Sequence, residues 1–230
     1  MSLDKFIAAI ANGGGVSFSN GYDIEFNFPS TLKGVVEKAI GGDPNKSDDG
    51  RSPGLVKMFC DEAQLPNVQA ATGQLNGRYL GENQYSYPYA KFYSDVSFSW
   101  MCDANMTPLK FLNSWHSFIF DGASKEAPQL VGKGATLSSM KSAVNTIGSG
   151  YARPVRLRYP KDYEAVMLIT KTERSAAAPN ARPSILYMLE GAYPYSIDSV
   201  PLSYGTSQIT KVTANFYYSK HTVVYGDQRN

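Results

Sequence analysis

Apolar and polar residues alternate strictly in two stretches of this chain, and that alternation limits its fold more than any other feature. From Tyr22 to Phe28, every even position is apolar and every odd position is polar. A period of two returns from Lys211 to Tyr218, within a segment at 209–224 that we expect to be the last and longest strand. Since alternate side chains of a strand point to opposite faces, this period is typical of half-buried antiparallel strands. The sequence therefore predicts a mainly β fold.

The composition agrees with a folded, strand-rich chain. Of the 230 residues, 43% are hydrophobic and 18% are charged, against roughly 25% charged in an average globular protein. The 16 tyrosines, 11 phenylalanines, 20 glycines and 13 prolines favour strands and turns. We expect one domain over residues 1–230, with inserted excursions at about 29–54 and 122–150. Further strands are expected at 55–63, 67–75, 78–93, 96–102, 155–159, 163–172 and 185–190, with a break at 191–194.

Helical periodicity is confined to short segments. A helix at 2–11 has one apolar face, formed by Leu3, Phe6, Ile7 and Ile10, and glycines 13–15 end it. That face can pack on its own subunit or on a neighbour, and the sequence leaves both open. A second helix is predicted over about 107–121, with Thr107 as N-cap and Pro108 in its first turn. Its apolar stripe, which we expect to pack on a sheet, contains Phe111, Leu112, Trp115 and Phe118. A short helix is also compatible with residues 31–40.

These elements predict an antiparallel β-sandwich or barrel with one packed helix, a short N-terminal helix and two inserted excursions. No apolar run reaches the roughly 18 residues that a membrane span needs. The first residues lack the basic-then-apolar pattern of a signal peptide, so we expect a soluble protein folded in a reducing cytoplasm.

The residues that usually carry catalysis do not form a recognisable set. Cys60, Cys102, His116 and His221 are the only cysteines and histidines, and their spacing matches no zinc site. A Cys–His nucleophile pair is formally open but unsupported, and no Gly-x-Ser-x-Gly elbow is present. We therefore predict no catalytic, metal or cofactor site. With 22 basic and 20 acidic residues, tight binding of a phosphate backbone is not favoured either. A binding or structural protein is the expectation.

A run of tyrosines lies between residues 79 and 93. Such a run can stack on carbohydrate rings or bases. It can also cover the edge of a β core or fill a subunit interface, which is the commoner role.

Four patches, in this order along the chain, resemble the tail tube proteins of contractile-tail bacteriophages. The first patch is the helix at 3–11 followed by the alternating strand at 22–28, and the second is the apolar-Cys-x-x-Ala-x-Leu-Pro pattern ending at Pro66. The third is the Val96-Ser97-Phe98-Ser99-Trp100 strand followed by the helix with Phe111, Leu112 and Trp115. The fourth is the C-terminal run from Glu190-Gly191-Ala192-Tyr193-Pro194 through Ile197, Leu202 and Tyr204 to the strand with Phe216, Tyr217 and Tyr218. Together they cover roughly two-thirds of the chain.

The resemblance implies a non-enzymatic virion protein without cofactors. Six copies would form a ring, and the rings would stack into a hollow inner tube through which DNA is ejected. The implied partners are further copies of the chain, the tail sheath protein, the baseplate tube initiator, and the tape measure protein and phage DNA in the lumen. DNA contact would be non-specific, and no membrane is involved. The implied location is the virion tail, assembled in the host cytoplasm.

Two sets of site residues follow from this expectation. The ring and subunit interface candidates are Leu3, Phe6, Ile7, Ile10, Tyr85, Tyr87 and Tyr89. The lumen-facing candidates are Asp23, Glu25 and Asn27, because a surface along which DNA slides should be acidic or neutral. The two excursions would decorate the tube exterior or contact the next ring.

Other functions are open from the sequence. A baseplate tube initiator or adaptor, or the tube protein of a type VI secretion apparatus, would share the fold. A tyrosine-rich β-sandwich that binds glycans is an alternative of another class, and an enzyme is the least favoured.

Overall fold

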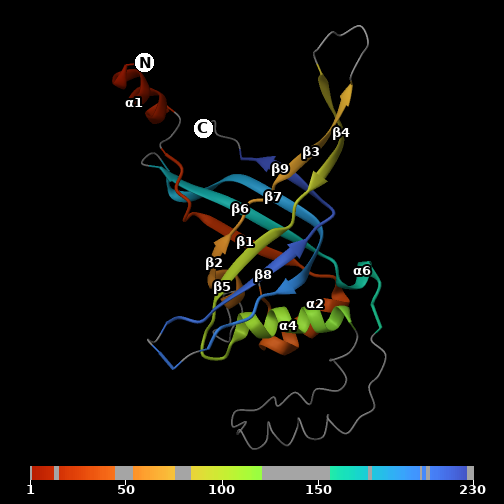
Figure 1. The fold of residues 1–230 in the computed structure, drawn as a ribbon. Helices are drawn as coiled ribbons and strands as arrows, with labels where there is room; N and C mark the ends of the chain where they lie inside the picture. The colour runs from red at the N-terminus through yellow and green to blue at the C-terminus, as the bar shows by residue number, and fades with distance from the viewer. Residues whose placement is uncertain are drawn as a thin grey trace, which may run out of the picture.

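The computed structural model describes residues 2–12, 16–44, 54–75, 84–120, 156–175, 178–202, 204–205 and 208–226. Antiparallel strands dominate it, with several short helices at the bottom of Figure 1 and the N-terminal helix apart from them at the top. This architecture confirms the predicted mainly β class. The expected excursion at 122–150 lies outside the described residues.

Seven strands form the main sheet, and all their pairings are antiparallel. The order across the sheet is β1-β6-β7-β8-β5-β2, with β9 beside β7. Their bounds are β1 Tyr22–Asn27, β2 Cys60–Ala63, β5 Val96–Met101, β6 Ala165–Ser175, β7 Ala178–Ile197, β8 Lys211–Tyr217 and β9 Lys220–Tyr225. The alternating sequences of β1, β5 and β8 place their apolar residues in one shared core.

The 20-residue strand β7 belongs to both halves of this sheet. Residues 185–190 pair with β9, and residues 193–197 pair with β8. Gly191 lies between these two segments with φ +68°, and a Cβ there would be 2.5 Å from the Ser219 Oγ atom. The predicted break at 191–194 is therefore wrong, because the glycine bends β7 without ending its pairing. The single strand predicted at 209–224 is two strands, β8 and β9, separated at Tyr218 and Ser219.

The two ends of the sheet, β1 and β2, meet through side chains. The Tyr22 hydroxyl donates a hydrogen bond of 2.9 Å to the Cys60 carbonyl oxygen. Lys57 Nζ lies 2.7 Å from an Asp23 carboxylate oxygen and 2.9 Å from one of Glu25. No ladder joins β1 to β2 in the described part of the chain, so these side-chain contacts close the barrel. Lys57 belongs to α3 (Leu55–Met58), which corrects the prediction of a continuous strand at 55–63.

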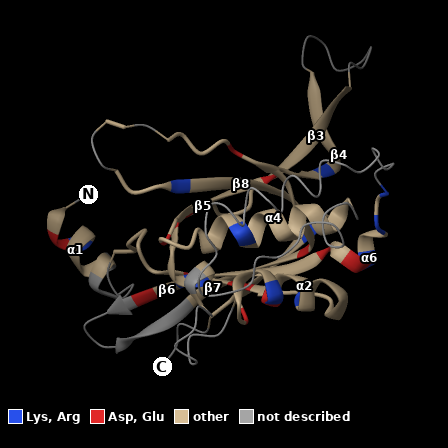
Figure 2. Cartoon of the chain, turned by 90° about the horizontal axis from the view of Figure 1, so that it is seen from below, with Lys and Arg blue, Asp and Glu red and all other residues tan. Residues whose placement is uncertain are grey.

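Helix α4 (Thr107–Ile119) fills the open end between the two halves of the sheet and contacts β7 and β8 (Figures 1 and 2). Its residues Phe111, Leu112, Trp115 and Phe118 are buried. The Trp115 ring lies edge-on to Phe28 at 5.0 Å, and its indole N–H donates to the Tyr163 carbonyl oxygen at 2.9 Å. This aromatic contact joins α4 to the sheet.

Helix α2 (Ser30–Ile40) packs beside α4 through Leu32, Val36 and Ile40, all buried. The first part of the predicted excursion at 29–54 is therefore a core helix, because its apolar residues recur at helical spacing. Residues 45–53 of that excursion lie outside the described residues.

The start of α4 differs from the prediction that Thr107 is the N-cap. Thr107 is the first helical residue, and Met106 before it has φ 55°. The Asp103 carboxylate accepts hydrogen bonds from the Thr107 backbone N–H at 2.6 Å and from its hydroxyl at 2.9 Å. An acidic side chain four residues upstream therefore takes the capping role.

A two-stranded hairpin, formed by β3 (Val68–Leu75) and β4 (Tyr85–Tyr93), projects away from the main sheet (Figure 1). The remaining helices are α1 (Leu3–Asn12) and α6 (Pro160–Tyr163). Residues 156–159 have no regular structure, which corrects most of the strand predicted at 155–159. Pro160 starts α6 there instead.

Candidate assembly surfaces

The described residues offer little for catalysis. No group of three or more His, Cys, Asp or Glu side chains in the described ranges is placed to hold a metal ion. Burial raises the pKa of the Cys60 thiol to about 12, and burial together with Asp103 raises the pKa of Cys102. Protonated thiols are weak nucleophiles, so this environment does not activate either cysteine. Among the described helices, none has the length and apolar character to cross a membrane.

Three of the four apolar residues of α1 are turned to solvent. Leu3 is 70% exposed, Phe6 53% and Ile7 56%, whereas Ile10 is half-buried. The helix stands away from the barrel at one side of the molecule (Figure 1). The chain that follows it is held at the far end of β6, where the Ser17 hydroxyl donates to Glu173 and Lys171 Nζ donates to the Phe18 carbonyl oxygen. The apolar face of α1 is therefore an exposed surface.

The hairpin carries a second exposed surface. Tyr85, Tyr87 and Tyr89 are all exposed. The β3–β4 register pairs Leu75 with Tyr85 and Gly73 with Tyr87, and a Cβ at Gly73 would lie 2.9 Å from the Tyr87 ring. Two of the three predicted tyrosines therefore share one face of the hairpin.

The register shift in the hairpin separates the third tyrosine from the other two. Ala71 pairs with Ala90 and Thr72 with Pro88, which leaves Tyr89 as the extra residue of a β-bulge. Tyr89 instead lines an open groove at the base of the hairpin. Sequence alternation alone places all three tyrosines on one face, because a bulge leaves no mark in that alternation.

The hairpin is joined to the barrel by a cluster of rings. The Tyr93 ring lies 5.8 Å from Tyr218 and 5.0 Å from His221, and the Tyr218 hydroxyl donates to the Asn67 carbonyl oxygen at 3.2 Å. Burial, with a contribution from Lys91, lowers the pKa of His221. The histidine is therefore part of the hairpin base and not an isolated surface residue, and its ring neighbours are distant in sequence.

The three predicted lumen residues lie on β1, where their side chains point away from the core. Two of them, Asp23 and Glu25, form ion pairs with Lys57. Burial alone would lower the pKa of Lys57, but its hydrogen bonds to these carboxylates raise it. The β1–β6 register pairs Glu25 with Leu168, so the apolar side chain of Leu168 lies next to Glu25 on the same face of the sheet. Their place in a tube lumen, and that of Asn27, stays a prediction.

A second face, on the side of β5 and β8 away from the core, carries small polar residues that are half-buried, except for the buried Ser99. Ser97 pairs with Asn215, and Ser99 pairs with Thr213 at an Oγ1–Oγ distance of 3.5 Å. The signal was present, since serines alternate with apolar residues in the 96–100 segment. Figure 2 shows acidic and basic residues scattered over the described elements and not gathered on one face.

Comparison with solved structures finds similar chains at low sequence identity. A chain of the anti-feeding prophage baseplate is 10% identical, with a TM-score of 0.49, over 92% of this chain and 97% of that one. A chain of the PVC sheath–tube complex, an extracellular contractile injection system, is 8% identical, with a TM-score of 0.45, over 98% and 99%. The Hcp1 protein of the E. coli EAEC 042 pathovar is 8% identical, with a TM-score of 0.45, over 90% and 92%. No curated protein matches the chain.

The family comparison is the decisive one. The family model described as phage tail tube protein matches residues 17–224. The match begins after α1 and ends within β9, so it includes the whole barrel and the hairpin. This chain belongs to the phage tail tube protein family.

Proposed function

We propose that copies of this tail tube protein assemble into hexameric rings that stack into the inner tube of a contractile tail. The observation that carries the proposal is the pair of exposed apolar elements, α1 and the β3–β4 hairpin. They stand apart in both views: in Figure 1 both lie at the top, α1 to the left and the hairpin to the right (Figures 1 and 2). Exposed apolar surfaces of this kind mark interaction sites. Two different surfaces on one subunit suit head-to-tail contacts, which generate rings or open-ended stacks.

The lumen of this tube would conduct DNA without holding it. A neutral or acidic lining meets that requirement, because basic residues would bind the phosphates. Two faces qualify by their net charge. On the β1 face with Asp23, Glu25 and Asn27, the one lysine, Lys57, is paired with both carboxylates. On the β5–β8 face with hydroxyl and amide side chains, Lys211 is paired with Asp61. The outer partners of the tube would be the sheath protein and the baseplate initiator, and the tape measure protein would fill the lumen before DNA. Assembly would take place in the host cytoplasm.

The first test is negative-stain electron microscopy of the purified chain across a concentration series. We expect annular particles of uniform diameter, or end-to-end tubes. Deletion of residues 2–11 and the pair Tyr85→Ser/Tyr87→Ser should each raise the concentration needed for assembly by about tenfold or more, as expected for central apolar anchors. Circular dichroism should show folded subunits in both variants, because neither surface is part of the core.

The matched control is Tyr159→Ser/Tyr225→Ser, which removes two exposed tyrosines outside the hairpin. It should assemble like the unmodified chain. Unchanged assembly of the deletion or the hairpin variant would show that the element concerned is not an interface. Monomers at every concentration would contradict spontaneous assembly and would favour the glycan-binding alternative, to be followed by a glycan screen.

A further inference from the structure

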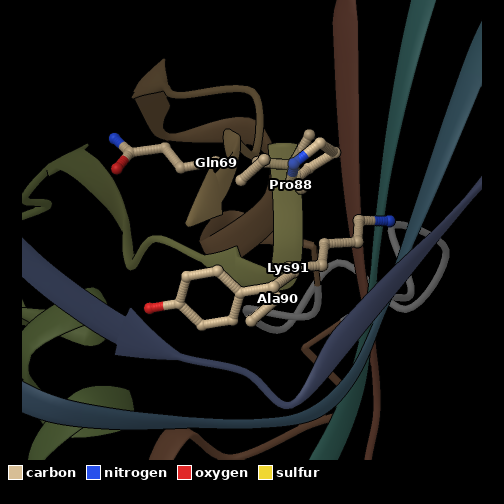
Figure 3. Close-up of a pocket in the computed structure, with 7 residues that line it drawn as sticks. Gln69, Pro88, Ala90 and Lys91 are labelled. Carbon is tan, nitrogen blue, oxygen red and sulfur yellow. The ribbon is translucent and has the colours of Figure 1, made fainter. Parts of the chain in front are cut away.

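The groove at the base of the hairpin has a volume of about 480 Å³ and opens to solvent. Its lining is mainly apolar or small, with one cation: Val68, Gln69, Ala70, Pro88, Tyr89, Ala90 and Lys91. Gln69 and Lys91 extend to opposite sides, and Pro88 and Ala90 lie between them (Figure 3). The bulge that releases Tyr89 from the ladder lets this side chain line the groove as well. The groove is therefore an apolar surface with a charge at one side.

Helix α1 has the complementary chemistry. Its exposed residues Leu3, Phe6 and Ile7 form one face, and Asp4 lies beside that face in the first turn. At a rise of 1.5 Å per residue, the ten-residue helix is about 15 Å long. Within the described ranges, Asp4 and Lys91 each lack an ion-pair partner. An apolar helix face with one acid would therefore match an apolar groove with one base.

The positions of the two elements favour contact between copies over contact within one chain. The connection after α1 is held at Glu173, near the end of β6. The hairpin base contacts His221 of β9, which pairs with Leu189 of β7. Leu189 in turn pairs with Met167, near the start of β6. Glu173 lies six residues after Met167 on β6, or about 20 Å along the strand. Both views also show α1 and the hairpin apart, α1 to the left and the hairpin to the right (Figures 1 and 2).

We propose that α1 of one copy packs into the groove at the hairpin base of a second copy, with Asp4 paired to the second copy's Lys91. This inference rests on the proposed self-assembly and names the segments that meet. α1 precedes residues 17–224, the part of the chain that the family model matches. Each copy donates one helix and receives one, which makes the contact heterologous and allows unlimited extension along a tube.

Disulfide crosslinking between two tagged populations tests the pairing directly. One population carries Ile7→Cys and a size tag, and the other carries Ala90→Cys. We expect at least tenfold more mixed disulfide from this pair than from Ala8→Cys mixed with Ala90→Cys. Ala8 is exposed on the side of α1 roughly opposite the apolar face, so it is the matched control. Both native cysteines are present in every sample, and the unmodified chain gives their background.

Charge reversal tests the ion pair. Asp4→Lys and Lys91→Glu should each raise the concentration for half-maximal assembly by about two- to fivefold, the range expected for an exposed pair. The double variant Asp4→Lys/Lys91→Glu should recover assembly. Equal defects in the single and double variants would contradict this pairing.

The crosslinking outcomes separate this contact from the proposed tube function. Tubes without excess Ile7–Ala90 crosslinking would overturn the helix-in-groove contact and leave tube formation intact. Excess crosslinking without rings or tubes would support the contact and contradict the tube. A chain with both cysteines that crosslinks internally at monomeric dilution would show that the groove takes its own helix, which overturns the assignment to a second copy.

Discussion

At the scale of single residues, His221 is the side chain whose charge state matters most to the base of the hairpin. Its ring contacts Tyr93, Tyr187 and Tyr218, and the charge of Lys91 contributes to the lowering of its pKa. Its neighbours come from three separate strands or their ends. The sequence shows only Lys220 beside it and therefore predicts a surface or half-buried histidine, without the ring cluster.

We expect the free energy of unfolding to decrease as the pH falls below about 6.5. The pKa of His221 is lower in the folded chain than its ordinary value of 6.5, because burial and Lys91 disfavour the charged ring. The folded state therefore binds fewer protons, and the stabilisation present above pH 6.5 is lost as the pH falls through the folded-state pKa. Urea unfolding between pH 5 and 8 measures this slope.

Substitution of either histidine tests whether His221 causes this pH dependence of the free energy of unfolding. His221→Gln should flatten it, whereas His116→Gln, on α4, should retain it. An unchanged slope in His221→Gln would assign the pH dependence to other groups.

At the scale of elements, the bend in β7 depends on one glycine. Gly191→Ala combines a φ of +68° with a Cβ placed 2.5 Å from Ser219 Oγ. We expect a loss of about 2 kcal/mol or more in the free energy of unfolding, measured by urea titration.

Substitutions at two other glycines separate the effect of backbone strain from the effect of the Ser219 contact. Gly41→Ala has a φ of +79° but nothing within 4 Å of the new Cβ, so only backbone strain of about 1 kcal/mol should appear. Gly34→Ala lies inside α2 with open space around it and should stabilise by roughly 0.5–1 kcal/mol. Equal losses for Gly191→Ala and Gly41→Ala would show that the Ser219 contact has no effect.

The sequence predicted those elements whose periodicity is set by burial on one face. β1, β5, β8 and the apolar stripe of α4 are examples, because each has one face in the shared core. It failed where a conformation has no periodic signature. The four-residue α3 is too short to show helical spacing, and the interruption at Tyr218 and Ser219 contains neither glycine nor proline.

The candidate surfaces could be predicted only in part, because neither exposure nor strand register has a periodic signature in the sequence. Helical spacing identifies the apolar face of α1, but it does not say whether that face is covered. The groove depends on the β3–β4 register and on the bulge at Tyr89, which are properties of two strands together. The sequence of either strand alone therefore does not predict the groove.

At the scale of the whole molecule, assembly should make thermal stability depend on protein concentration. A partner that binds only the folded state raises the free energy of unfolding by mass action. We expect the melting temperature of the full chain to rise with concentration. After deletion of residues 2–11 it should change little, because an interface element is missing while the core stays complete. Scanning calorimetry over a hundredfold concentration range measures both. A constant melting temperature for the full chain would contradict association of folded subunits.

The continuity of β7 across both halves of the barrel has a mechanical consequence. A pull that tends to part the two halves is transmitted along the covalent backbone through Gly191, and the ladders with β6, β8 and β9 share it as shear. Opposite β7, the contacts across the seam between β1 and β2 that the described residues provide against the same pull are made by side chains. Under tension the barrel should therefore yield first at Tyr22 and Lys57, opening like a hinge about β7 while that strand stays intact.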